Sequence, residues 1–182
     1  MNNLNDPELI ESVLGGDPEA FGVLVGRYSD TVFALVFRIA GNREDAEEIV
    51  QDAFVKAYGS LGKFRRDSSF SSWIYRIAYN TAISPLRKNK NVRMTELAEE
   101  RLRIADEDSP AEREGLFREE QLSRLEEALA RLSPDERAVV QLFYLEERPV
   151  REISRITGLS ENNVKTRLHR IRKRLGAIYE NL

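Results

Sequence analysis

The stretch that decides the fold runs from residue 149 to residue 175 and reads PVREISRITGLSENNVKTRLHRIRKRL. Ile153 and Ile156 supply the inner face of a short helix, and Gly158 permits a tight turn. Ser160 is a good N-cap for a second helix. On that second helix, apolar residues recur at helical spacing and predict one buried stripe; they are Val164, Leu168, Ile171 and Leu175.

The other side of this second helix carries hydrogen-bond donors and positive charge. Its members are Lys165, Thr166, His169, Arg170, Arg172 and Lys173. The layout is that of a helix-turn-helix, whose second helix enters the major groove and meets base edges and phosphates. An ordinary helical hairpin with a solvated basic face is the alternative. The turn, the cap, the stripe and the basic excess agree, and together they favour DNA binding.

Two further signals precede this unit. Leucines at 122, 125, 129 and 132 predict an apolar stripe, and Ser133-Pro134-Asp135-Glu136 is typical of a capping box with proline at the first helical position. The C-terminal part of the chain is therefore expected to be a compact domain of four short helices.

Helical periodicity extends over most of the 182 residues, with no sustained period-two alternation, so the predicted fold is all-α. The helices are expected near 7–14, 18–40, 43–58, 69–88, 117–131, 134–146, 149–156 and 160–178. Residues 89–115 hold few large apolar side chains and many acids, which is typical of a flexible linker. Two small helical domains joined by an acidic linker follow from this pattern.

The net charge of −3 conceals alternating acidic and basic segments. Residues 1–75 carry seven basic and twelve acidic side chains, and residues 76–93 carry five basic and none acidic. Residues 94–147 carry seven basic against sixteen acidic, and residues 148–182 nine against three. The two basic segments are candidates for contact with phosphates.

Composition also excludes several kinds of chemistry. The chain has no cysteine and a single histidine, His169, so thiolate metal sites and cysteine nucleophiles are excluded and neither a catalytic residue nor a cofactor is expected. Residues 1–17 contain acids and no lysine or arginine, unlike a secretory signal. We expect a cytoplasmic, soluble protein.

The expected helix 43–58 presents acids on its outside: Glu44, Asp45, Glu47, Glu48 and Asp52. Paired carboxylates can serve acid–base catalysis or bind a hard metal ion. Without a nearby histidine, a solvated face or a docking surface for a basic partner is favoured.

The segment 64–80 interleaves aromatic residues with arginines and hydroxyls, then enters the basic segment. This composition suits single-stranded nucleic acid, because bases stack on aromatic faces while cations follow the backbone. Helical spacing also fits Phe70, Trp73 and Ile74 as a core stripe, so the loop 64–69 is the better candidate for reading bases.

Together these pieces resemble the bacterial sigma factors of the extracytoplasmic-function (ECF) class. The resemblance rests on residues 20–28, the run DAEEIVQDAF at 45–54, residues 64–80 and residues 132–175, in the order that the family has them. It implies a sigma-2 domain at 1–92, a linker at 93–117 and a sigma-4 domain at 118–182. It also implies an RNA polymerase subunit that opens promoters without covalent chemistry and has no small-molecule substrate.

The resemblance assigns roles to particular residues. Docking on the β′ clamp helices of core RNA polymerase falls to Asp45, Glu47, Glu48, Gln51 and Asp52. Capture of the minus-10 element, with a base taken out of the stack, falls to Phe64, Arg65, Ser68, Ser69, Trp73, Arg76 and Asn80. The helix 160–175 is similar to those that read the minus-35 element, through Lys165, Thr166, His169, Arg170, Arg172 and Lys173. Further implied partners are the β flap, promoter DNA and an anti-sigma factor.

Three alternatives and expectations remain at this point. A stand-alone helix-turn-helix regulator is the second function, and a carboxylate-metal enzyme is a disfavoured third. Ser84 stands where many family members have an acid, and Pro85 predicts a kink or a stop in its helix. The acidic linker is expected to compete with DNA for the basic faces until polymerase holds the domains apart.

Overall fold

The computed structural model describes residues 4–88, 125 and 127–180, and every regular element among them is helical. In the first half these elements are α1 (Asp6–Leu14), α2 (Glu19–Ala40), α3 (Arg43–Ser60), the short η1 (Leu61–Lys63) and α4 (Phe70–Lys88). In the second half they are α6 (Pro134–Val140), η3 (Gln141–Leu145), α7 (Val150–Thr157) and α8 (Glu161–Glu180). The predicted all-α class is confirmed.

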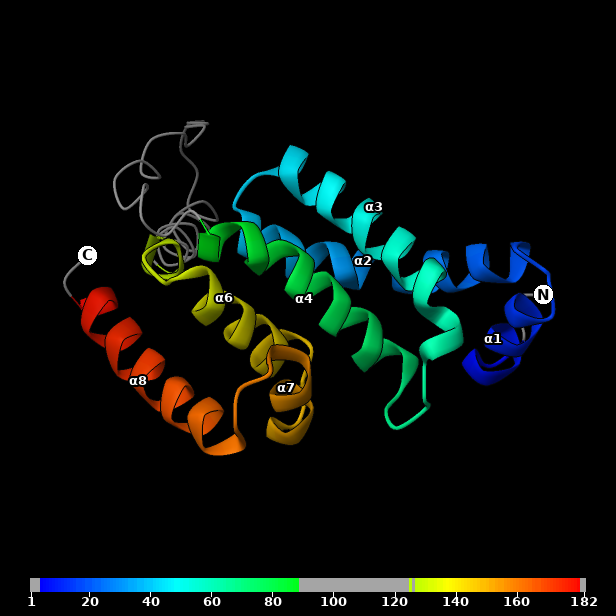
Figure 1. Ribbon diagram of the computed structural model, residues 1–182. Helices are drawn as coiled ribbons and strands as arrows, with labels where there is room; N and C mark the ends of the chain where they lie inside the picture. Colours follow the sequence, from blue (N-terminus) through cyan, green and yellow to red (C-terminus); the bar gives the residue numbers. More distant parts are fainter. Residues whose placement is uncertain (1–3, 89–124, 126, 181–182) are drawn as a thin grey trace, which may run out of the picture.

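Caps fix the ends of the N-terminal helices. Asn5 and Glu8 form a reciprocal capping box at the start of α1, one residue before the expected break. Gly41 ends α2 with φ of 86°, a left-handed conformation that glycine adopts without a Cβ penalty. Asn42 then accepts a hydrogen bond from the Asp45 amide and starts α3. The sharp α2–α3 turn lays the two helices side by side (Figure 1).

The core of the first half lies between α2, α3 and α4, which pack against one another. Leu24 and Leu35 of α2, Ala53 of α3 and Ile74 of α4 are completely buried there. Within the described residues, α2 alone is long and apolar enough to cross a membrane, with a mean hydropathy of 1.4. Its apolar residues pack into this core, so its composition is explained by burial.

The helix α4 passes through Pro85 and continues to Lys88, so the proline does not stop it. Pro85 lies four residues from the end, and the Ser84 hydroxyl donates to the Asn80 carbonyl at 2.6 Å. One lost backbone hydrogen bond in the last turn is tolerated because most of the helix is held by packing.

The C-terminal helices begin where the sequence places their caps. Ser133 and Glu136 form the predicted capping box of α6. The chain then winds as a π-helical turn through η3, and Gly158, with φ of 74°, ends α7. Leu125, expected in the apolar stripe, is 43% exposed, so that expectation is wrong at this residue.

The two halves pack directly on each other. Helix α4 contacts α7, and α2 contacts α6, so the buried residues form one continuous cluster (Figure 1). The sequence predicts two domains but not this contact between them. The expected linker, residues 93–117, lies outside the described residues.

Candidate nucleic-acid interface and docking surface

The outer face of α8 is the clearest candidate for reading duplex DNA. All six predicted side chains are exposed: Lys165, Thr166, His169, Arg170, Arg172 and Lys173. The inward stripe is confirmed, since Val164, Leu168 and Ile171 are buried and Leu175 is half-buried. Burial of this stripe fixes the rotation of α8 and turns the donors toward solvent.

The turn before α8 is held by its own hydrogen bonds. Thr157 donates to the Ile153 carbonyl at 2.7 Å, and Ser154 donates to the Leu159 carbonyl at 2.5 Å. The Ser160 hydroxyl accepts from the Asn163 amide at 3.3 Å, as a capping residue does. These bonds set the angle between α7 and α8 and complete a helix-turn-helix.

Two arginines of α8 are occupied within the protein. Arg167 donates to Asn163 at 3.1 Å, and Arg174 forms an ion pair with Glu136 at 3.2 Å while also donating to the Arg131 carbonyl. Arg174 thus ties α8 to α6. The six predicted residues have no such bond among those observed and stay available for a partner.

The loop before α4 carries an aromatic cluster. Ring centroids of Phe64 and Trp73 lie 5.0 Å apart, and those of Phe70 and Trp73 lie 5.7 Å apart. Phe70 is buried, whereas Phe64 and Trp73 are half-buried. The structure therefore divides the aromatic residues as the sequence suggests, with Phe70 in the core and Phe64 and Trp73 offering partly open faces.

Trp73, Arg76 and Asn80 share one face of α4. Their spacing of three and four residues places them in a row, and Arg76 and Asn80 are exposed. Arg65, also exposed, lies in the loop ahead of them. The structure thus brings a cation, an indole and an amide together in one strip.

The loop serines play different parts. The Ser69 hydroxyl accepts from the Ser72 amide at 3.2 Å and lies 2.9 Å from the Ser72 hydroxyl, so Ser69 caps α4. Ser68 is half-buried in the bend before it. Arg66 adopts φ of 58° and pairs with Glu11 of α1 at 3.1 Å, which fixes the loop against the first helix.

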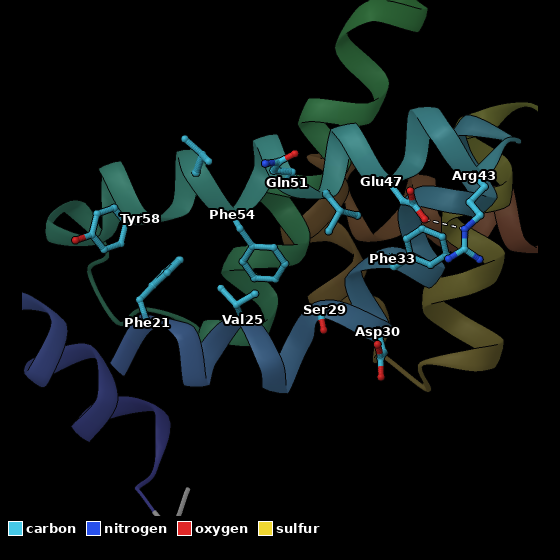
Figure 2. Close-up of a pocket in the computed structure, with 12 residues that line it drawn as sticks. Phe21, Val25, Ser29, Asp30, Phe33, Arg43, Glu47, Gln51, Phe54 and Tyr58 are labelled. Atoms are coloured by element: carbon cyan, nitrogen blue, oxygen red, sulfur yellow. Dashed lines mark hydrogen bonds and ion pairs between the residues drawn. The ribbon is translucent and has the colours of Figure 1, made fainter. Parts of the chain in front are cut away.

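A groove between α2 and α3 forms the second candidate surface, with a volume of about 710 Å³. Figure 2 shows Phe21 and Tyr58 at one end, Val25 and Phe54 along its length, and the Arg43–Glu47 pair at the other end. Apolar side chains make up most of its lining. The tools for binding here are shape and apolar contact, with charge at the rim.

Polar contacts define the charged end of this groove. The Arg43 Nε–Glu47 Oε1 distance is 2.7 Å, and the Arg43 guanidinium lies 5.7 Å from the Phe33 ring centroid. Both charged side chains are more than half exposed, so this pair adds little stability. A partner's charge can exchange with it.

The five predicted docking residues are all exposed on α3: Asp45, Glu47, Glu48, Gln51 and Asp52. Glu47 and Gln51 line the groove, whereas Asp45 accepts from the Asn42 amide group at 2.7 Å and Asp52 lies 4.0 Å from Lys56. Among the described residues, no cluster of three or more histidine and acidic side chains could hold a metal ion.

Sequence reasoning missed the apolar part of this surface. Val55 and Tyr58 are 66% and 49% exposed, although they belong to a helix whose outside otherwise carries charge. A large apolar residue among the acids of an exposed helical face was the available signal. Phe21 and Val25 of α2 gave none, because they also fit the core pattern of that helix.

Comparison with known families matches both halves of the chain. Sigma-70 region 2 matches residues 24–92, and Sigma-70 region 4 matches residues 122–175. The first match contains the groove and the aromatic loop, and the second contains the helix-turn-helix.

Similar proteins cover nearly the whole length. The ECF RNA polymerase sigma factor SigW of Bacillus subtilis is 34% identical over 91% of this chain and 92% of its own. The RNA polymerase sigma-H factor of Pseudomonas aeruginosa is 31% identical over 92% and 90%. Among solved structures, CnrH in complex with the cytosolic domain of CnrY aligns with a TM-score of 0.66 at 26% identity, covering 97% of each chain.

These matches join region 2 to region 4, an arrangement that a helix-turn-helix regulator acting alone does not need. The chain belongs to the ECF RNA polymerase sigma factors. It directs transcription initiation as a subunit of RNA polymerase, and its family is not a class of enzymes.

Proposed function

We propose that three surfaces of this sigma factor divide the work of initiation. The groove between α2 and α3 docks on core RNA polymerase, the loop 64–69 with the adjoining face of α4 captures the minus-10 element, and α8 reads the minus-35 element. The domain limits that go with these roles are 1–92 for the first two and 118–182 for the third, with 93–117 between them.

The observation that carries the docking assignment is the groove itself. Phe21, Val25 and Phe54 give it an apolar lining, while Glu47 lies at the rim and Glu48 is exposed on the same helix. An amphipathic helix with an apolar stripe and basic flanks fits such a site. The clamp helices of the β′ subunit are the occupant that the family resemblance implies.

The minus-10 assignment is supported by the aromatic strip. A flipped base needs an open aromatic face and nearby hydrogen-bond donors. Phe64 and Trp73 supply partly open rings, and Arg65, Arg76 and Asn80 supply exposed donors around them. Ser68 and Ser69 complete the loop, although the Ser69 hydroxyl already serves the start of α4.

The minus-35 assignment is supported by the exposure of the six side chains on α8. Arginine and lysine can bind guanine edges or phosphates, and the short hydrogen-bonded turn keeps the reading helix rigid. The β flap of polymerase is the protein partner that the resemblance assigns to this half. The work belongs in the cytoplasm, where core polymerase is found.

An anti-sigma factor is the remaining proposed partner. The CnrH structure holds the cytosolic domain of CnrY, which shows that a relative with this fold is bound by a second protein. The groove and the exposed basic face offer such a partner two surfaces to cover.

Charge reversal on α3 tests the docking assignment. Glu47→Lys with Glu48→Lys should weaken binding to core polymerase at least tenfold in a fluorescence titration, because a basic helix would then meet like charges. Val55→Asp should weaken it as well, because Val55 is an exposed apolar lining residue. Binding of an isolated minus-35 duplex should not change.

Glu19→Lys is the matched control, since it reverses an exposed charge at the start of α2 outside the groove. Unchanged core affinity in both the α3 variants would reject the groove as the docking site.

A further inference from the structure

The contact between the two halves of the chain is made through one face of α4. Tyr75 and Tyr79 on this face are completely buried, and Ser72 is 5% exposed. These three residues follow one another at intervals of three and four, so they lie in a row along the helix. The row differs from the one that carries Trp73, Arg76 and Asn80.

Each hydroxyl in this row donates to a carboxylate of the other half. Ser72 donates to Glu152 of α7, Tyr75 donates to Glu146 at 2.8 Å, and Tyr79 donates to Asp135 of α6 at 2.5 Å. We call these three pairs the hydroxyl row. They connect residues 56 to 80 positions apart in the sequence.

Arg148 reinforces the middle of the hydroxyl row. Its guanidinium lies 5.0 Å from the Tyr75 ring centroid and 3.1 Å from a Glu152 carboxylate oxygen. Burial, aided by the Glu146 acceptor, raises the pKa of Tyr75 above its ordinary value, so the phenol stays a neutral donor. Near the same contact, Arg155 of α7 approaches the Asp67 carbonyl at 3.5 Å, next to the loop that we assign to the minus-10 element.

This closed packing conflicts with the distance between the two promoter elements. Their centres are about 25 base pairs apart, or roughly 85 Å along B-DNA at 3.4 Å per pair. A compact chain of this length has a radius of gyration of about 16 Å, or roughly 40 Å across. One closed molecule is too small to reach both elements.

We propose that the hydroxyl row is a latch that holds free sigma factor closed, and that promoter binding requires it to break. The closed state keeps the α4 face dry and holds α7 beside the minus-10 loop. Opening exposes both tyrosines and lets the two readers separate. The proposal rests on the proposed function only for what opening achieves, because closure is a property of the free chain.

A distance measurement on the free protein tests the latch directly. The chain has no native cysteine, so two introduced ones, Glu44→Cys on α3 and Arg151→Cys on α7, take spin labels without background. Ser72→Ala with Tyr75→Phe and Tyr79→Phe removes the hydroxyls and keeps most of the volume. We expect the single short distance to give way to a longer, broader distribution, with the open-to-closed ratio at least tenfold higher.

Tyr28→Phe is the matched control. Its hydroxyl also donates to a carboxylate, that of Asp6, but both residues lie in the first half. This control should leave the distance distribution unchanged. An unchanged distribution in the triple variant would overturn the latch.

A reversible lock gives the second test. Ser72→Cys with Glu152→Cys is joined by a thiol crosslinker that contains a reducible disulfide, and promoter-directed transcription is measured with core polymerase. The locked protein should give at least tenfold less transcript, and reduction should restore it. Equal transcription before and after reduction would overturn the proposal. Absence of transcript from the unlocked wild-type chain would instead count against the proposed function, while the distance measurement still decides the latch.

Discussion

At the scale of single residues, spacing on α8 determines which side chains face outward. Three buried stripe residues fix the rotation of the helix, and the exposed positions follow. For this reason the six minus-35 candidates could be named from the sequence. Spacing gives no information on side-chain partners, and the occupation of Arg174 by Glu136 could not be foreseen.

Arg170→Ala should weaken binding of the protein to a minus-35 duplex. If Arg170 meets a phosphate, the slope of log affinity against log salt concentration should fall by about one unit. If it reads a base, discrimination at one position should relax by about 1–3 kcal/mol. Fluorescence anisotropy over a salt series measures both. Arg43→Ala removes an equal charge on α3 and serves as the control; an Arg170 variant that behaves like it would contradict this orientation of α8.

Two tyrosines make stability depend on alkaline pH. Burial, followed by the hydrogen bond to Asp6, raises the pKa of Tyr28, and burial raises that of Tyr75, both from an ordinary value of 10.0. The folded state therefore favours the protonated phenols. Their contribution is fully present below pH 10 and is lost as pH rises through the higher folded-state values.

The free energy of unfolding should accordingly fall above about pH 10. Tyr28→Phe and Tyr75→Phe should each reduce the steepness of that fall, because one titrating phenol is removed. Urea unfolding between pH 8 and 11 measures the slope, with the exposed Tyr58→Phe as control. Variants with the wild-type slope would show that these phenols do not supply it.

At the scale of elements, local signals predicted most helices to within a few residues. The Ser133 capping box and the Gly158 turn were both recognisable, because caps and left-handed turns depend on nearby residues. The π-helical turn of η3 was not, since it has no local signature. The fate of Pro85 was also misjudged, because packing of α4 outweighs one lost hydrogen bond.

Ser133→Ala should destabilise the protein by about 0.5–2 kcal/mol, since the α6 amides lose their cap. That change lowers the midpoint of thermal unfolding by roughly 2–4 °C per kcal/mol in a chain of this size. Circular dichroism melting measures it. Ser84→Ala replaces an exposed serine inside α4 and should not lower the midpoint; equal midpoints for the two variants would contradict the role given to the cap.

At the scale of the whole molecule, sequence reasoning gave the order of the regions but not their contact. The hydroxyl row joins residues far apart in the chain, and no periodicity records such pairs. The docking groove was half found: its acids were visible as a charged face, while its apolar lining was assigned to the core. The net charge of −3, which alone would speak against DNA binding, conceals two basic readers and an acidic docking half.

The central claim is that this chain gives core RNA polymerase its promoter specificity. In vitro transcription with purified core enzyme and a library of genomic fragments from the source organism tests it most directly. The account predicts discrete transcripts that start at defined sites, share minus-10 and minus-35 sequences, and disappear with the Glu47→Lys and Glu48→Lys variant. A purified, folded chain that yields no promoter-directed transcript from any fragment would contradict it.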